Sequence, residues 1–207
     1  EKEKQMKLFY TPGASSLFPH IVLCELGLPH ELEKVDLRSH STADGSDYFA
    51  INPKGYVPAL KLDDGQLLTE GPAIVQYLAD RKPEAGLLPP AGTLERARVQ
   101  EWLTFIGTEI HKSFSPLFRP DASDDWKAAA RTNLDRRLAF VDQALAGRDY
   151  LAGCQFSVAD VYLFTVLSWA RYVQIDLATW PALAAFQARV ATRPAVQAAM
   201  QSEGLLK

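Results

Sequence analysis

The sequence predicts a chain of two parts, a mixed α/β half followed by an all-helical half. Three observations support this fold class. The hydrophobic pattern changes period repeatedly over the first 80 residues, the segment 82–92 is rich in proline and glycine, and the pattern beyond it has a helical period. We therefore expect an α/β domain at residues 6–82, a linker at 83–92 and a helical domain at 93–207.

Each element of the first half follows from a local signal. A β-prone run ends at Thr11-Pro12-Gly13, and two serines precede an apolar helix that Gly27 terminates. Asp63-Asp64-Gly65 between two apolar runs is a hairpin signal. In the order βαβαββα, the expected segments are 7–10, 17–26, 30–36, a weak short helix within 41–51, 58–62, 66–68 and 70–78.

Helical spacing defines two apolar stripes in the second half, and we expect both to be buried. Their members are Leu134, Leu138, Val141 and Leu145, and then Val158, Tyr162, Val166, Trp169 and Val173. Ahead of the second stripe, Ser157 and Asp160 have the spacing of a capping box, with Phe156 placed to pack onto Val161. We interpret this pair as fixing the start of a helix rather than as chemistry.

Composition excludes several classes of protein. The net charge of −3 provides no global basic field for nucleic acid. The two cysteines, Cys24 and Cys154, are too few for a disulfide framework or a cysteine-rich zinc site, and Cys24 is expected to be a buried apolar residue. No run has the ~18–20 apolar residues of a membrane helix, and no secretory signal is visible, so a cytoplasmic location is expected.

Four segments, taken in order, resemble the glutathione transferases: residues 7–16 (KLFYTPGASS), 52–60 (NPKGYVPAL), 68–74 (LTEGPAI) and the Ser157–Asp160 cap. The resemblance covers nearly all of residues 6–207. The Pro-Gly-Ala turn and His111 are most similar to the bacterial beta class. The resemblance implies a thioredoxin-like domain followed by a helical domain, a homodimer, and glutathione as co-substrate with no other cofactor.

Five positions depart from the usual beta-class pattern. Ser15 stands where a cysteine is usual, and His40, Tyr56, Gly71 and Thr104 stand where lysine, glutamine, serine and asparagine are common. The resemblance places all five around the glutathione site. Because a cysteine can form a mixed disulfide with glutathione and a serine cannot, Ser15 favours thiolate stabilisation.

Three residues are candidates for catalysis. Ser15, just ahead of a predicted helix, can donate a hydrogen bond to the thiolate sulfur. Tyr10 is a rival phenolic donor, and the resemblance implies that His111 faces the sulfur from the second domain. Structural roles stay open beside these: Ser15 or Ser16 can cap the helix, Tyr10 can be a half-buried strand residue, and His111 can be structural, since no second histidine or carboxylate lies at a metal-ligand spacing.

The binding residues are implied by the resemblance together with local chemistry. A cis peptide at Val57-Pro58 would turn the Val57 backbone toward the cysteinyl part of glutathione. Glu70 and the amides around Gly71, at a predicted helix start, suit the ammonium and carboxylate of the γ-glutamyl end, although Glu70 is also a favourable first-turn acid. His40 is placed near the glycine carboxylate. Phe114 and Phe118, in an aromatic series that is mostly core, are candidates for an apolar electrophile pocket.

These observations predict a glutathione transferase that conjugates reduced glutathione to a small apolar electrophile. Another glutathione-dependent reaction, such as isomerisation, dehalogenation or peroxide reduction, remains an alternative. So does a non-enzymatic binding or regulatory protein on the same fold, since fold does not fix function. Neither nucleic acid, nor a membrane, nor a metal is an expected partner.

Overall fold

The computed structural model describes residues 5–153 and 155–206. The chain divides into two compact units, one made of Glu1–Ala85 with Arg193–Lys207 and the other of Gly86–Thr192. The boundary at 85/86 lies inside the segment expected as a linker. Cys154 and residues 1–4 lie outside the described residues.

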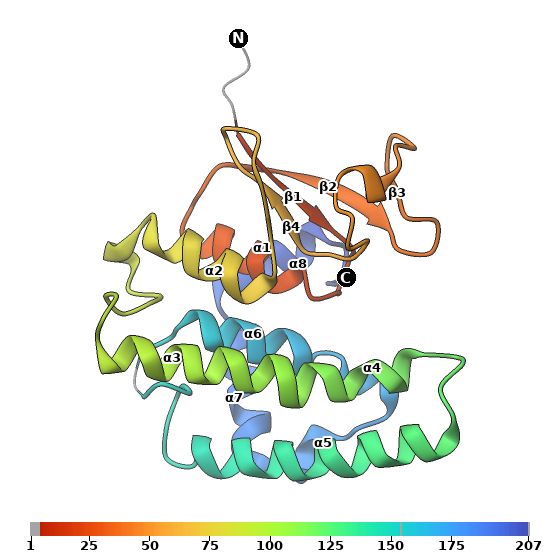
Figure 1. Cartoon of the computed structure of the whole chain (residues 1–207). Helices are drawn as coiled ribbons and strands as arrows, with labels where there is room; N and C mark the ends of the chain where they lie inside the picture. The colour runs from red at the N-terminus through yellow and green to blue at the C-terminus, as the bar shows by residue number, and fades with distance from the viewer. Residues whose placement is uncertain (1–4, 154, 207) are drawn as a thin grey trace. The chain divides into compact units, whose positions relative to one another are not determined.

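A five-stranded mixed sheet forms the centre of the first unit (Figure 1). Its strands, in the spatial order β3-β2-β1-β4-β5, are β3 (Ser41–Thr42), β2 (His30–Asp36), β1 (Met6–Tyr10), β4 (Ala59–Lys61) and β5 (Leu67–Thr69). β1 pairs with β2 in parallel, whereas β1–β4, β2–β3 and β4–β5 are antiparallel. A parallel pair needs a crossover, which helix α1 provides, and the Asp63-Asp64-Gly65 turn makes the predicted hairpin.

Three helices lie on one side of this sheet: α1 (Leu17–Glu25), α2 (Gly71–Asp80) and α8 (Pro194–Ser202) (Figure 1). α1 is packed against both α2 and α8. Burial of Val196 and Ala199 and a bidentate Arg193–Glu25 ion pair, at 2.6 and 3.0 Å, join the C-terminal segment to the first unit. This differs from the sequence-based division, which assigns residues 93–207 to the helical domain, because helical periodicity does not reveal which core a helix joins.

The segment expected as a weak helix at 41–51 has a different structure. It forms the short strand β3 and a 3₁₀ turn, η1 (Tyr48–Ala50), which the Asp47 side chain caps at the Phe49 amide over 2.9 Å. Tyr48 is fully buried in a cluster with Phe9, Val35, Val57 and Ala59. The tertiary contacts of one aromatic ring therefore override a weak helical preference.

The second unit is helical throughout its regular elements (Figure 1). They are α3 (Leu94–Phe105), the π-helix η3 (Ile106–His111), α4 (Lys112–Phe118), α5 (Asp124–Leu145), α6 (Val158–Leu167), the 3₁₀ turns η4 (Ala170–Val173) and η5 (Leu177–Thr179), and α7 (Pro181–Ala191). A further 3₁₀ turn, η2 (Pro83–Ala85), ends the first stretch of the first unit. α3, η3 and α4 form one continuous rod, and α6 is buried along its whole length.

The stripes and the cap are confirmed. All nine predicted stripe residues are buried. The capping box at the start of α6 is present: Asp160 accepts hydrogen bonds from the amide and the hydroxyl of Ser157, both at 2.8 Å, and from the Leu151 amide at 2.8 Å. Asp160 is fully buried, and its hydrogen bond to the Leu151 amide also holds the loop that precedes α6. No helix within the described residues is both long and apolar enough to cross a membrane.

Candidate active site

The loop that precedes β4 is the framework of the site in the first unit. Asn52 is buried and donates from its side-chain amide to the Tyr56 carbonyl over 2.8 Å, and the Tyr48 hydroxyl donates to the same carbonyl over 3.1 Å. The Val57–Pro58 peptide is cis, as the resemblance implies. These contacts fix the backbone on either side of Val57.

Ser15 is joined to this loop. Its hydroxyl donates to the Val57 carbonyl over 3.0 Å, across 42 residues of sequence. The capping alternative is wrong for both serines as far as the described contacts show: the Ser16 hydroxyl bonds to the backbone of Thr11, and Ser16, at the N-cap position of α1, makes no side-chain capping bond. Ser15 is therefore held beside Val57 by a tertiary contact rather than by helix capping.

Glu70 lies at the N-cap position of α2 with a left-handed backbone, φ +68°. A non-glycine residue in this region carries strain of roughly 1–3 kcal/mol, and such residues gather at functional sites. Its carboxylate accepts from Lys54 Nζ over 2.6 Å and from the Tyr56 hydroxyl over 2.7 Å, and Lys54 also reaches Thr69. The helix begins one residue later than expected, so Glu70 is a flanking residue rather than a first-turn acid.

The charges around Glu70 affect one another. The hydrogen bond to Glu70 raises the pKa of Lys54 and the pKa of Tyr56. Lys54 thus stays cationic and Tyr56 stays a neutral donor at neutral pH. The three side chains form an exposed polar cluster at the N-terminus of α2, where the helix dipole and the Gly71 amide favour a carboxylate. Pro72 has no amide hydrogen, and the Ala73 amide donates to the Glu70 carbonyl over 2.9 Å.

Gly71, the first residue of α2, is required by its neighbour on α1. A Cβ atom at this position would lie 2.1 Å from Cζ of Phe18, a fully buried ring. Any side chain at position 71 would therefore require the Phe18 ring to move.

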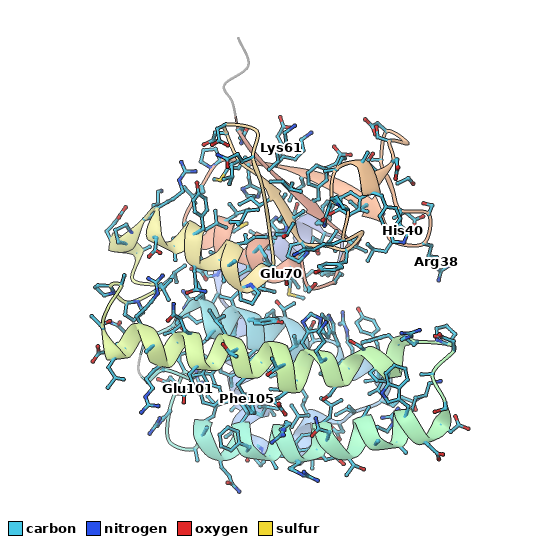
Figure 2. The ribbon with its side chains drawn as sticks, in the orientation of Figure 1. Arg38, His40, Lys61, Glu70, Glu101 and Phe105 are labelled. Atoms are coloured by element: carbon cyan, nitrogen blue, oxygen red, sulfur yellow. The ribbon has the colours of Figure 1, made fainter. Side chains whose placement is uncertain are left out.

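His40 also has a left-handed backbone, φ +50°. Its ring lies 4.3 Å from the Phe49 ring, and Nδ1 donates to the Gly55 carbonyl over 3.0 Å, which leaves Nε2 as the nitrogen available to other groups. A side chain at Gly55 would collide with Phe49. Glu70 and His40, both labelled in Figure 2, thus belong to segments that the loop 52–58 contacts directly.

Tyr10 has a different environment from Ser15. Its ring centroid lies 6.4 Å from that of His20 on α1. Burial, and then the Glu203 carboxylate, raise the pKa of Tyr10, so the phenol stays protonated.

The candidates in the second unit centre on η3. His111 is the last residue of this π-helical turn, a feature often found at functional sites. Its Nδ1 lies 2.6 Å from the Tyr162 hydroxyl, and its ring lies edge to face with Trp169 at 4.8 Å. Burial lowers the pKa of His111 to about 4, so the imidazole is neutral at pH 7.

Aromatic side chains continue from His111 along α4. Phe114 is fully buried and Phe118 is exposed, and both rings pack on Trp169, at 5.7 and 6.2 Å. Thr104 is exposed on α3, and its hydroxyl donates to the Gln100 carbonyl of its own helix over 2.9 Å.

The structure thus brings together Ser15, Tyr56, Val57, Pro58, Glu70, Gly71 and His40 in the first unit, and His111, Phe114 and Phe118 in the second. Sequence reasoning missed Lys54 as the partner of Glu70, and Tyr162 and Trp169 as partners of His111. Tyr162 carried a usable signal, because a buried phenol needs a hydrogen-bond partner.

Comparison with known proteins agrees with this fold. Residues 16–81 match the glutathione S-transferase N-terminal domain family, and residues 105–194 match the corresponding C-terminal domain family. A glutathione S-transferase of Escherichia coli O157:H7, GstA, is 51% identical over 200 residues, which are 97% of this chain and all of the relative.

Two solved structures extend the comparison. A sphingomonad glutathione S-transferase complexed with glutathione is 52% identical with a TM-score of 0.93, and the beta-class enzyme of Sphingomonas chungbukensis is 49% identical with a TM-score of 0.94. Each alignment covers 97% of this chain and 100% of the other. On this evidence the chain belongs to the glutathione S-transferase family.

Proposed function

We propose that this glutathione transferase conjugates reduced glutathione to a small apolar electrophile, and that Ser15 stabilises the attacking thiolate. The observation that supports the role of Ser15 most directly is its hydrogen bond to the Val57 carbonyl at 3.0 Å. A residue donating to that carbonyl lies within reach of a ligand that pairs with the same backbone group. No cofactor beyond the co-substrate is needed.

The γ-glutamyl end of glutathione would bind at the start of α2. Its carboxylate suits the Gly71 amide, at the positive end of the α2 dipole, and the nearby Lys54 ammonium. Its ammonium suits the Glu70 carboxylate, which already accepts from Lys54 and Tyr56 through one oxygen, Oε1. His40 Nε2 would meet the glycine carboxylate at the opposite end of the tripeptide.

The cysteinyl part would pair with the backbone of Val57. Once its amide donates to the Val57 carbonyl, the Ser15 hydroxyl is released from that acceptor and can rotate toward the sulfur. A free thiol has a pKa of about 8.5, and lowering it by one or two units corresponds to about 1.4–2.7 kcal/mol of preferential binding of the anion. One charge-assisted hydrogen bond supplies roughly this amount.

The second unit would supply the apolar half of the reaction. Phe114, Phe118 and Trp169 present an aromatic surface suited to an apolar electrophile, and His111 is a neutral group held by Tyr162. A neutral imidazole can donate a hydrogen bond without adding charge to an apolar surface. We further propose that the enzyme acts in the cytoplasm as a homodimer, and light scattering that gives the mass of one chain would reject the dimer.

Ser15→Ala tests the catalytic assignment, with Ser39→Ala as the control because Ser39 is exposed and bonds only locally in the described contacts. The ultraviolet absorbance of the thiolate gives the pKa of bound glutathione, and a panel of electrophiles, peroxides and chlorinated aromatics gives turnover. We expect Ser15→Ala to raise the thiol pKa by one unit or more and to lower turnover at pH 7 about tenfold. An unchanged thiol pKa and unchanged turnover would reject the role of Ser15, and glutathione binding without turnover on any substrate would favour a non-enzymatic protein.

A further inference from the structure

Three possible metal ligands converge in the first unit, and the described side-chain hydrogen bond of Ser15 goes to Val57 rather than to any of them. His20 and Cys24 are one turn apart on α1 and so lie on the same face of the helix. His30 is the first residue of β2, which follows the turn after α1. One ligand atom from each residue lies within 4.8 Å of the other two, and the two imidazole rings are 5.5 Å apart, edge to face.

Each histidine is already oriented by a hydrogen bond on its other nitrogen. His20 Nδ1 lies 2.8 Å from Glu203 Oε1, and His30 Nδ1 lies 2.8 Å from the Leu28 carbonyl. Glu203 is itself held, because its Oε2 accepts from the Gly13 amide over 2.9 Å. In metal-bound histidines, the ring nitrogen that does not bind the metal usually donates to a carboxylate or a carbonyl group. Here that nitrogen is Nδ1 in both rings, so Nε2 of each ring is the ligand atom.

Burial and solvent access also suit a metal ion. His20 and Glu203 are both buried, whereas Cys24 and His30 are half-buried, so an ion could enter from their side. Cys24 is only half-buried, and so differs from the buried apolar residue expected from sequence. Bonds of ~2.0–2.3 Å to a tetrahedral ion would set the ligand atoms about 3.3–3.6 Å apart, so the longest separation would shorten by roughly 1 Å, within reach of side-chain rotation.

We propose that His20, Cys24 and His30 form a three-ligand binding site for Zn²⁺, with water as the fourth ligand. Two imidazoles and one thiolate match the nitrogen and sulfur preference of this ion. Binding replaces the hydrogen on Cys24 Sγ and any proton on the Nε2 atoms, and these protons are released to solvent. The ion would tie α1 to the start of β2, and Glu203 would couple the C-terminal segment to it. The conjugation proposed above does not require this ion, although the His20 ring lies 6.4 Å from that of Tyr10.

The test is a metal-buffered Zn²⁺ titration of the untagged full chain, with Co²⁺ as a spectroscopic probe. The variants are Cys24→Ala and His30→Gln, and the matched control is Cys154→Ala, which removes the other cysteine of the chain. His20 is not substituted, because its loss would remove the partner of Oε1 of the buried Glu203 carboxylate. Circular dichroism and glutathione binding verify that each variant is folded.

We expect one Zn²⁺ per chain and a thiolate-to-cobalt absorption band in the parent protein and in Cys154→Ala. Cys24→Ala should lose the band and bind Zn²⁺ at least 100-fold more weakly, and His30→Gln should bind it at least tenfold more weakly. Free Zn²⁺ at 100 times its Kd should raise the Tm of the parent by roughly 5–10 °C. Absence of stoichiometric binding, or affinity that neither Cys24→Ala nor His30→Gln reduces, would overturn the site, and His30→Gln alone decides if Cys24→Ala does not fold.

Discussion

The contact between Gly71 and Phe18 provides the most quantitative prediction. A Cβ atom at position 71 would lie 2.1, 2.7 and 3.0 Å from Cζ, Cε1 and Cε2 of Phe18. Carbon atoms in contact normally stay about 3.5–4.0 Å apart, so the ring would have to move by more than 1 Å. Phe18 is 1% exposed, and a close-packed core gives it no space to do so.

The cost of Gly71→Ala follows from this geometry. Overpacking of a core costs about 1–3 kcal/mol, and replacing a helical glycine returns at most about 1 kcal/mol. A net loss near 2 kcal/mol lowers the Tm of a chain of this length by about 4–8 °C. Urea unfolding followed by circular dichroism, with a thermal scan, measures both quantities.

A double-mutant cycle isolates the contact. Leucine lacks the three ring atoms that collide, so in a Phe18→Leu background Gly71→Ala should be close to neutral, giving a coupling of about 2 kcal/mol. Gly107→Ala is the matched control, because Gly107 is also helical and its nearest contact would be an ordinary 3.5 Å to Tyr162. Gly71→Ala as stable as the parent, or additive effects in the cycle, would refute the reasoning.

The same pair bears on glutathione affinity. The substitution Gly71→Ser, which introduces the residue that the beta class commonly has here, should by itself lower the stability of the chain, because its Cβ would collide with Phe18 in the same way. With Phe18→Leu present, the serine hydroxyl becomes available to the γ-glutamyl carboxylate, and one hydrogen bond of about 0.5–1.5 kcal/mol predicts binding tighter by about 2- to 13-fold. Calorimetric titration of glutathione into the double variant measures this affinity. An unchanged affinity would show that residue 71 affects packing against residue 18 but not glutathione binding.

Three further predictions follow from the other contacts. Glu70→Gln keeps the shape of the side chain but removes its charge, so the affinity for glutathione should fall by about tenfold. The affinity for S-methylglutathione should fall equally, and calorimetry measures both. A loss of affinity for only one of the two ligands would contradict γ-glutamyl binding by this carboxylate. Asp160→Ala leaves three buried donors without their acceptor and should cost about 3–5 kcal/mol in urea unfolding, whereas a cost under 1 kcal/mol would show that the cap is dispensable. Burial holds the pKa of His111 near 4, below its value of about 6.5 in the unfolded chain, so its contribution to stability is complete above pH 6.5 and declines by up to about 3 kcal/mol as the pH falls toward 4. Unfolding of the parent and of His111→Gln at several pH values isolates this term, and parallel curves would refute it.

The sequence by itself determined most of the elements of this protein, because their signals are local. The strand at β1, the helix between Ser16 and Gly27, the hairpin turn, the proline-rich boundary and the buried stripes depend on spacing within a few residues of one another. The Ser157–Asp160 cap is equally local, since both partners lie in one turn. The cis bond at Val57 came only with the family resemblance, because local sequence rarely specifies it.

The tertiary structure alone decided which distant residues meet. Glu70 pairs with Lys54 and Tyr56 across 16 and 14 residues, Ser15 meets Val57 across 42, and His111 meets Tyr162 across 51. A helix with one apolar face has the same sequence pattern whichever core that face packs against, so the sequence did not reveal that α8 joins the first unit. Nor did it reveal that Phe18 excludes a side chain at Gly71, because the two residues belong to different helices. The His20, Cys24 and His30 cluster has the same origin: α1 sets two of its members, and only the pairing of β2 with β1 brings the third beside them.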